Sequence, residues 1–163
     1  MLIEKVIINT SPLIVLFKSE LIDLLPRLFT EIWVPEAVWC EVVEAGKTDA
    51  ASKQLPTVSW VKRVSVATIS PRISSWGLDA GESEVLSLTL ENPDYRAIID
   101  DAAARRVART LEIPVLGTVG ILLLAKKRGL IPSVTIPIQA LRDAGLWLAD
   151  EFVQSLLRQT GEL

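Results

Sequence analysis

The sequence predicts an α/β fold, a three-layer α/β/α sandwich whose central sheet is mainly parallel. Short β-branched runs alternate with helical segments along the chain, which is typical of right-handed βαβ crossovers. A length of 163 residues suits one domain, residues 1–163, with a single core that needs no disulfide. Half of the residues are hydrophobic and the mean hydropathy is +0.38, so we expect a compact chain.

The first part of the chain opens this alternation. The expected elements are a strand at residues 2–8, a helical stretch at 13–29, a strand at 32–34 and a helix from 35 to about 45. Ser11 is expected to cap the first helix, with Pro12 in its first turn. A break is expected near Pro26, because proline disrupts a helix interior.

The middle of the chain is more polar, and the alternation then resumes. Loops are expected at residues 46–57 and 68–77, with a short edge strand within 58–66. The later elements are a helix at 79–92, a strand at 96–100, a helix at 102–111, a strand at 114–116, a helix at 119–128 and a helical tail at 138–159. The tail is expected to break near Gly145.

Composition excludes several kinds of chemistry. The chain has no histidine, and Cys40 is its only cysteine, so histidine-based triads, internal disulfides and cysteine- or histidine-ligated zinc are excluded. Catalysis or metal binding must therefore use Asp and Glu. The net charge of −3 argues against a broadly basic nucleic-acid binder but allows a local basic stripe.

We expect a cytoplasmic protein. A single cysteine fits a reducing compartment. The longest apolar stretch, residues 115–125, is interrupted by Gly117, Thr118 and Gly120 and is too short to cross a bilayer as a helix. The first residues have no cleavage site of small residues and are interpreted as a strand rather than an export signal.

One glutamate of the helix that starts at residue 35 is expected to point inward. A helical projection puts Glu41 within an apolar face made of Ala37, Val38, Val42 and Ala45. Glu36 projects away from that face. A carboxylate inside an apolar stripe is costly unless it is paired or binds a cation. The alternative is a partly exposed helical glutamate without a special role.

The helix at 79–92 repeats this pattern. Glu82 falls on the apolar face formed by Leu78, Val85, Leu86 and Leu88, whereas Glu84 projects to the opposite side. Glu82 is therefore the candidate for a site. Alternatively, both Glu82 and Asp79 are acids of a first helical turn, where the helix dipole favours negative charge.

Polar residues also end two predicted strands. Asp100 and Asp101 directly follow an apolar run, and Asn9 ends the first strand. Ligands of open parallel sheets bind at the carboxyl ends of the strands. Either aspartate could instead be an N-cap, but two adjacent acids need only one cap. Converging carboxylates suit Mg²⁺ or Mn²⁺, which prefer oxygen ligands and assist phosphodiester hydrolysis without histidine.

Five segments, in this order, resemble a known family. They are NTSPLI, VPEAVWCEVV, LDAGESEVL, IIDDAAARRVA and GTVGILLLAKKRGLI, and together they cover nearly the whole chain. The order and spacing are similar to PIN-domain proteins related to VapC-type toxins. The resemblance implies a Mg²⁺-dependent ribonuclease whose acids occupy the places of Asn9, Glu41, Glu82 and either Asp100 or Asp101.

The resemblance also has one departure and some supporting residues. Asn9 stands where the family has its most constant acid. An amide oxygen can ligate a metal, but it contributes no negative charge. Thr118 occupies the place of a family Ser or Thr that hydrogen-bonds near the site, although a plain N-cap is an equal interpretation. Thr10 and Ser11 either orient ligands or cap the first helix.

Basic residues follow the strand-end acids. Arg105, Arg106 and Arg109 project to one side of their helix and could contact RNA phosphate, or could simply form a solvated face. The run Gly117-Thr118-Val119-Gly120 fits no nucleotide-binding pattern. The five tryptophans are interpreted mainly as core or interface anchors. If several are exposed, they mark an oligomer or partner surface.

Two hypotheses follow from the sequence. The first is a metal-dependent endoribonuclease acting on RNA, as the toxin half of a toxin-antitoxin pair. The second is a catalytically silent PIN-like module that binds RNA or a protein partner, because Asn9 replaces an acid. A chain this apolar is also expected to form a homodimer, and an antitoxin protein could occlude its site.

Overall fold

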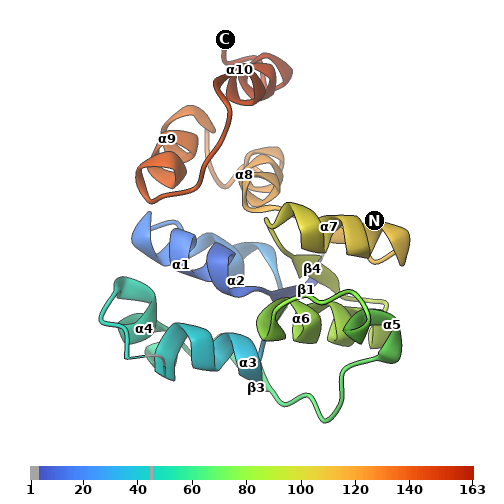
Figure 1. The fold of residues 1–163 in the computed structure, drawn as a ribbon. Coiled ribbons are helices and arrows are strands. Elements are labelled where there is room, and N and C mark those ends of the chain that lie inside the picture. The colour runs from blue at the N-terminus through green and yellow to red at the C-terminus, as the bar shows by residue number, and fades with distance from the viewer. Residues whose placement is uncertain (1–3, 45) are drawn as a thin grey trace.

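A computed structural model describes residues 4–44 and 46–163, and its centre is a five-stranded sheet in which every pairing is parallel. The strands are β1 (Lys5–Ile8), β2 (Glu31–Pro35), β3 (Val61–Val64), β4 (Arg96–Ile98) and β5 (Val115–Leu116). Their order is β3-β2-β1-β4-β5. The predicted fold class is confirmed, and Figure 1 shows helices on both sides of the sheet.

Helices connect these strands, and three more follow β5. They are α1 (Thr10–Lys18), α2 (Leu24–Leu28), α3 (Glu36–Trp39), α4 (Ala50–Gln54), α5 (Pro71–Ser74), α6 (Ala80–Glu91), α7 (Ala102–Thr110), α8 (Thr118–Lys127), α9 (Thr135–Asp143) and α10 (Asp150–Gln159). A π-helical turn, η1 (Cys40–Glu44), continues α3, and a 3-10 turn, η2 (Leu55–Thr57), follows α4. No helix in the described part of the chain is long and apolar enough to span a membrane.

The core lies around the central strand. Val6, Ile7 and Ile8 of β1 are completely buried, because a parallel strand in the middle of a sheet is covered on both faces. Ile7 is in register with Trp33 of β2 and with Ala97 of β4. This arrangement brings the carboxyl ends of β1 and β4 to the same edge.

Two predictions about the first helix were wrong. Its N-cap is Asn9 rather than Ser11, so the helix begins at Thr10, two residues earlier than a Ser11 cap would allow. The break falls at Glu20, which adopts a left-handed conformation with φ of 60°, rather than at Pro26. Pro26 is instead tolerated near the start of α2, where a backbone N–H has no intrahelical partner.

Both predicted loops contain a short helix. Within residues 46–57, the side chain of Asp49 accepts a hydrogen bond from the Ser52 amide at 3.1 Å and caps α4. Ser70 caps α5 in the same way at 3.3 Å. Short caps of this kind stabilise single helical turns that periodicity does not show.

The other expected elements occur close to their predicted bounds. The edge strand within 58–66 is β3, and the helical tail breaks between α9 and α10 at Gly145, which has a φ of 110°. The expected start of the first strand at residue 2 and the expected end of a helix at residue 45 lie outside the described residues.

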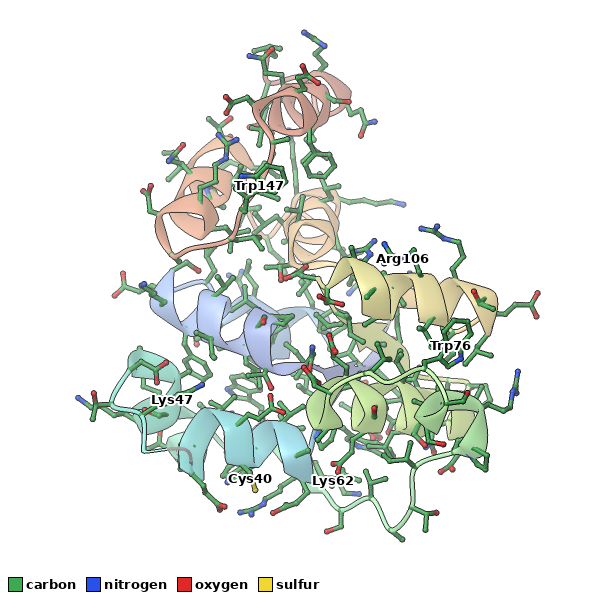
Figure 2. The ribbon with its side chains drawn as sticks, viewed as in Figure 1. Cys40, Lys47, Lys62, Trp76, Arg106 and Trp147 are labelled. Carbon is green, nitrogen blue, oxygen red and sulfur yellow. The ribbon has the colours of Figure 1, made fainter. Side chains whose placement is uncertain are left out.

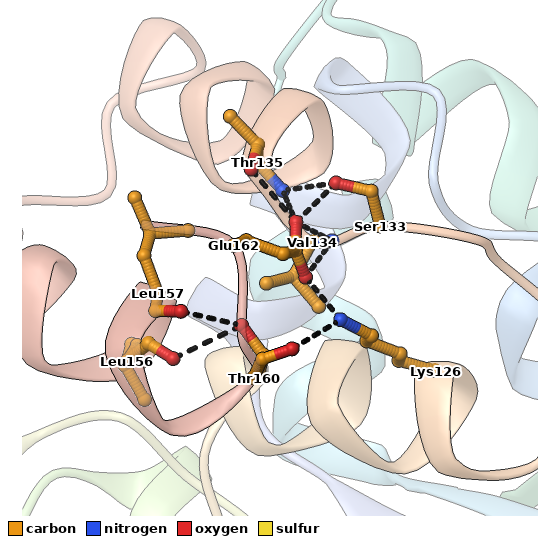
Figure 3. Close-up of polar contacts among 8 residues, drawn as sticks. All are labelled: Lys126, Ser133, Val134, Thr135, Leu156, Leu157, Thr160 and Glu162. Carbon is orange, nitrogen blue, oxygen red and sulfur yellow. Dashed lines mark hydrogen bonds and ion pairs between the residues drawn. The ribbon is translucent and has the colours of Figure 1, made fainter.

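The C-terminal helices α9 and α10 extend from α8 away from the sheet (Figure 1). Glu162 fastens them together (Figure 3). Its carboxylate accepts hydrogen bonds from Ser133 Oγ, from the Val134 amide at 3.0 Å and from Thr135 Oγ1 at 2.7 Å. It also pairs with Lys126 Nζ of α8 at 2.5 Å. These contacts hold the pKa of Glu162 well below its usual range.

We therefore expect Glu162→Gln to lower the urea midpoint of unfolding at neutral pH. The substitution removes the charge that Lys126 pairs with while keeping the size of the side chain. Glu4→Gln, at an exposed position, is the control and should leave the midpoint unchanged. Equal midpoints for Glu162→Gln and the wild type would show that this contact does not stabilise the fold.

Candidate functional site

The carboxyl ends of three strands form one continuous edge. The amide of Asn9 donates to the carbonyl of Ile98 at 3.0 Å, and the amide of Ile99 donates to the carbonyl of Leu116 at 3.2 Å. The hydrogen bonding of the sheet therefore continues past the last residues of β1 and β4. Asn9 and Asp100 accordingly leave the sheet from neighbouring strands at this edge.

Asn9, Thr10 and Glu41 converge beside Gly81. The Asn9 side chain is 6% exposed, and its Oδ1 has no hydrogen-bond partner among the described residues. Thr10 Oγ1 donates to Glu41 Oε2 at 2.6 Å. A Cβ at Gly81 would lie 2.9 Å from Glu41 Oε1 and 3.3 Å from Asn9 Oδ1. Both oxygens therefore border the same space, which is kept open because residue 81 has no side chain.

Local helix geometry directs Glu41 toward this space. Glu41 lies in η1, a π-helical turn of a kind that often occurs at functional sites. Val38 and Val42 are completely buried, as expected for the apolar face, and Glu36 points away to pair with Arg63. Glu41 is half-buried, as the alternative of a partly exposed helical glutamate expects, and its carboxylate also accepts the hydrogen bond from Thr10.

Glu84 has a structural role that the sequence did not reveal. It lies on α6, and its Oε1 accepts a hydrogen bond from the Ala37 amide at 2.9 Å, which satisfies a free N–H at the start of α3. This hydrogen bond joins α6, which carries Glu82, to α3, which continues into the η1 turn that carries Glu41. Only the packing of two helices distant in sequence could show this cap.

Glu82 lies in a crowded acidic corner. It forms a capping box with Asp79, whose Oδ1 accepts from the Glu82 amide at 2.8 Å. The Glu82 side chain is 8% exposed. Burial, and then repulsion by Asp79 and Asp101, raise the pKa of Glu82 to about 7. The first-turn interpretation is therefore correct for its position in α6, but the carboxylate is also buried beside other acids.

The two strand-end aspartates have different partners. Asp101 caps α7 by accepting from the Ala104 amide at 2.9 Å. Asp100 accepts from the Thr118 amide at 2.8 Å and from Thr118 Oγ1 at 2.6 Å. Thr118 is not the N-cap of α8, because Gly117 takes that place. Thr118 instead fixes the Asp100 carboxylate at the start of α8.

The three arginines do not share one environment. Arg105 is half-buried, and its Nη1 donates to the carbonyl of Ile99 at 3.4 Å. A Cβ at Gly117 would lie 2.6 Å from Arg105 Nη1 and 3.3 Å from Asp100 Oδ1, so the guanidinium approaches the strand-end acids. Arg106 and Arg109 are exposed on α7. Ser11 is also exposed, in the first turn of α1.

The geometry and the sequence agree on a family. A family model described as PIN domain matches residues 5–162. The chain belongs to the PIN-domain family. PIN domains have a nuclease fold and are generally dependent on divalent metals. No curated protein matches the sequence.

The oxygen atoms at this edge of the PIN domain are of the type that a hard divalent cation prefers as ligands. The buried Asn9 Oδ1 lacks a partner, and the Glu41 carboxylate borders the same space. Mg²⁺ and Mn²⁺ prefer such oxygen ligands and retain several waters. Within residues 4–44 and 46–163, no three His, Cys, Asp or Glu side chains are grouped closely enough to hold a metal. Binding would therefore rely on few protein ligands together with water and substrate.

The raised pKa of Glu82 predicts that the stability of the protein in metal-free buffer depends on pH. Because the folded state holds this proton more tightly than the unfolded state, the free energy of unfolding should fall as the pH rises from about 4.5 to about 7. Glu82→Gln should lack this loss, so its stability relative to the wild type should increase across that range and then level off. Urea titrations at several pH values in EDTA measure the difference.

Glu91→Gln is the matched control, because Glu91 is exposed near the end of the same helix. Its stability relative to the wild type should not change between pH 4.5 and 7. A pH-independent difference between Glu82→Gln and the wild type would contradict the buried, repelled carboxylate described above.

Proposed function

We propose that this PIN-domain protein is a cytoplasmic, Mg²⁺- or Mn²⁺-dependent endoribonuclease whose substrate is RNA. The main support for this proposal is an unpaired oxygen atom. The buried amide oxygen of Asn9 has no partner and borders the same space as the Glu41 carboxylate. An unpaired buried acceptor is costly, and a bound cation would remove that cost.

The proposed ligands come from several elements. Asn9 and Glu41 would hold the cation directly. Glu82 and the strand-end acids Asp100 and Asp101 would add negative charge that balances the positive charge of the cation. When bound, such a metal supplies an activated water and neutralises charge on the phosphate. The protein's own contribution is to place these oxygens at one sheet edge and to keep the space beside Gly81 open.

Neighbouring side chains would orient the ligands and the substrate. Thr10 holds one oxygen of Glu41, and Thr118 holds both oxygens of Asp100. Arg105 would contact an RNA phosphate through charge-assisted hydrogen bonds, because its guanidinium lies beside Asp100. Arg106 and Arg109, which are exposed cations, would contact phosphates further along the RNA strand.

Glu41→Gln should reduce cleavage of single-stranded RNA by at least about 100-fold in Mg²⁺ or Mn²⁺, because the amide removes the charge of a proposed ligand. Asp101→Asn should also reduce it. Glu36→Gln is the matched control, since Glu36 lies on the same helical segment but pairs with Arg63. Cleavage that EDTA does not stop, or that survives Glu41→Gln unchanged, would contradict the proposal.

Asn9 also favours a second candidate, a PIN-domain module that binds RNA or protein without cleaving it. Its amide adds no negative charge at the place where the family has an acid. The two candidates differ in the metal affinity of the wild-type protein. A silent module has no need to bind Mn²⁺, whereas an enzyme does.

We expect Asn9→Asp to bind Mn²⁺ about 10- to 100-fold more tightly than the wild type, because an added carboxylate strengthens attraction to a divalent cation. Isothermal titration calorimetry measures both affinities directly. Measurable binding by the wild type supports the enzyme. If only Asn9→Asp binds Mn²⁺, the silent module is the better account.

The proposed cellular role is that of a toxin controlled by an antitoxin protein, and the proposed assembly is a homodimer. Large apolar side chains are exposed in the C-terminal part of the chain, including Ile136, Trp147 and Phe152. Apolar groups of this size commonly mark an interface. An antitoxin that covers the acidic edge would block access of RNA.

Light scattering should give the mass of a dimer at micromolar concentration. Trp147→Ser should shift the equilibrium toward the monomer, because Trp147 is 83% exposed and its loss should not disturb the core. A monomeric mass that stays constant as the concentration rises would contradict the dimer and leave the proposed metal site unaffected.

A further inference from the structure

Two of the five tryptophans are strongly exposed. Trp76 is 47% exposed and Trp147 is 83% exposed, whereas Trp33, Trp39 and Trp60 pack partly against the core. Figure 2 shows Trp76 near α5 and α6, and Trp147 among the C-terminal helices. The two exposed rings therefore belong to different surfaces.

The turn that carries Trp76 is held in place by the segment that precedes it. Ile73 is completely buried, and the Trp76 amide donates to its carbonyl at 3.1 Å. The Ser70 amide donates to Ser87 Oγ of α6 at 2.9 Å, which fixes the start of the same segment. The ring is thus presented by an anchored backbone, and little ordering would be needed when it binds a ligand.

Trp76 lies close to the acidic corner of the candidate site. It precedes Asp79 by three residues, so their Cα atoms are at most about 11 Å apart. Asp79 is hydrogen-bonded to Glu82, and Asp101 lies near enough to help raise the pKa of Glu82. A short single strand with one phosphate at the acids can therefore place a nearby base on Trp76.

The exposed charged residues near the two tryptophans in the sequence differ. Arg72 is exposed on α5, four residues before Trp76, and Arg106 is exposed on α7. Trp147 is instead followed by the exposed acids Asp150 and Glu151, and Arg142, five residues before it, already pairs with Asp150 at 2.9 Å. An aromatic ring accompanied by cations is what a single-stranded nucleic acid recognises, because bases stack and phosphates pair with arginine.

We infer that Trp76 is a stacking platform for an unpaired RNA base next to the cleavage site. This inference rests on the proposed function, because it takes RNA as the substrate. It adds a residue that selects single-stranded over double-stranded RNA. A base in an RNA duplex must first break its pairing and stacking before it can stack on the ring, and this costs free energy. The acids would hold the cation that assists phosphodiester hydrolysis, and Trp76 would position the strand.

Binding without cleavage tests the inference. A fluorescently labelled oligouridine, titrated by anisotropy in Mg²⁺ at fixed low salt with every protein carrying the cleavage-reducing Asp101→Asn change, reports RNA affinity with the cation present and cleavage suppressed. Trp76→Ala should weaken binding about 5-fold or more, the usual loss for one stacked base. Trp76→Phe should retain most of the affinity, and Leu163→Ala, which removes another exposed apolar side chain, should bind as the wild type does.

An abasic substitution moved along the oligouridine identifies the stacked base. At one position the missing base should weaken binding to the wild type but not to Trp76→Ala, because the two changes remove the same contact. Equal RNA affinities of Trp76→Ala and the wild type would overturn the inference. This result is expected if Trp76 binds a protein partner instead of RNA. If the wild type binds no RNA at all, both the inference and the RNA substrate fail.

Discussion

Repulsion among carboxylates at one sheet edge is the constraint on which the rest of the structure depends. Helices α6, α7 and α8 all begin at this edge, and their free N–H groups favour negative charge. Asp79, Asp101 and Asp100, respectively, accept a backbone N–H at the start of these helices. The pKa of Glu82 is nevertheless raised, first by burial and then by repulsion from Asp79 and Asp101, so the helix ends do not fully offset these two effects. A divalent cation would supply the missing positive charge.

Two glycines keep this edge open. Any side chain at Gly81 would meet the oxygens of Glu41 and Asn9, and any side chain at Gly117 would meet the guanidinium of Arg105. Neither glycine has a positive φ, so close approach rather than backbone conformation explains both. The fold therefore reserves space beside the acids and also brings one cation to them.

Much of the fold was predictable because strands and helices have different periods and because Asp100 directly follows an apolar strand. Local effects were not predictable in this way. The left-handed Glu20 and the π-helical turn around Glu41 depend on backbone conformations that hydrophobic periodicity does not report. The contacts of Thr118 with Asp100, and of Glu84 with the start of α3, join segments far apart in sequence.

The central claim is that this edge binds a divalent metal through Asn9 and Glu41. A crystal grown with Mn²⁺ and measured at a wavelength where manganese scatters anomalously tests the claim most directly. We expect an anomalous peak within coordination distance of Asn9 Oδ1 and the Glu41 carboxylate, on the side where Gly81 leaves space. A crystal with no peak at this edge, and with Glu41 bound only to Thr10, would contradict it.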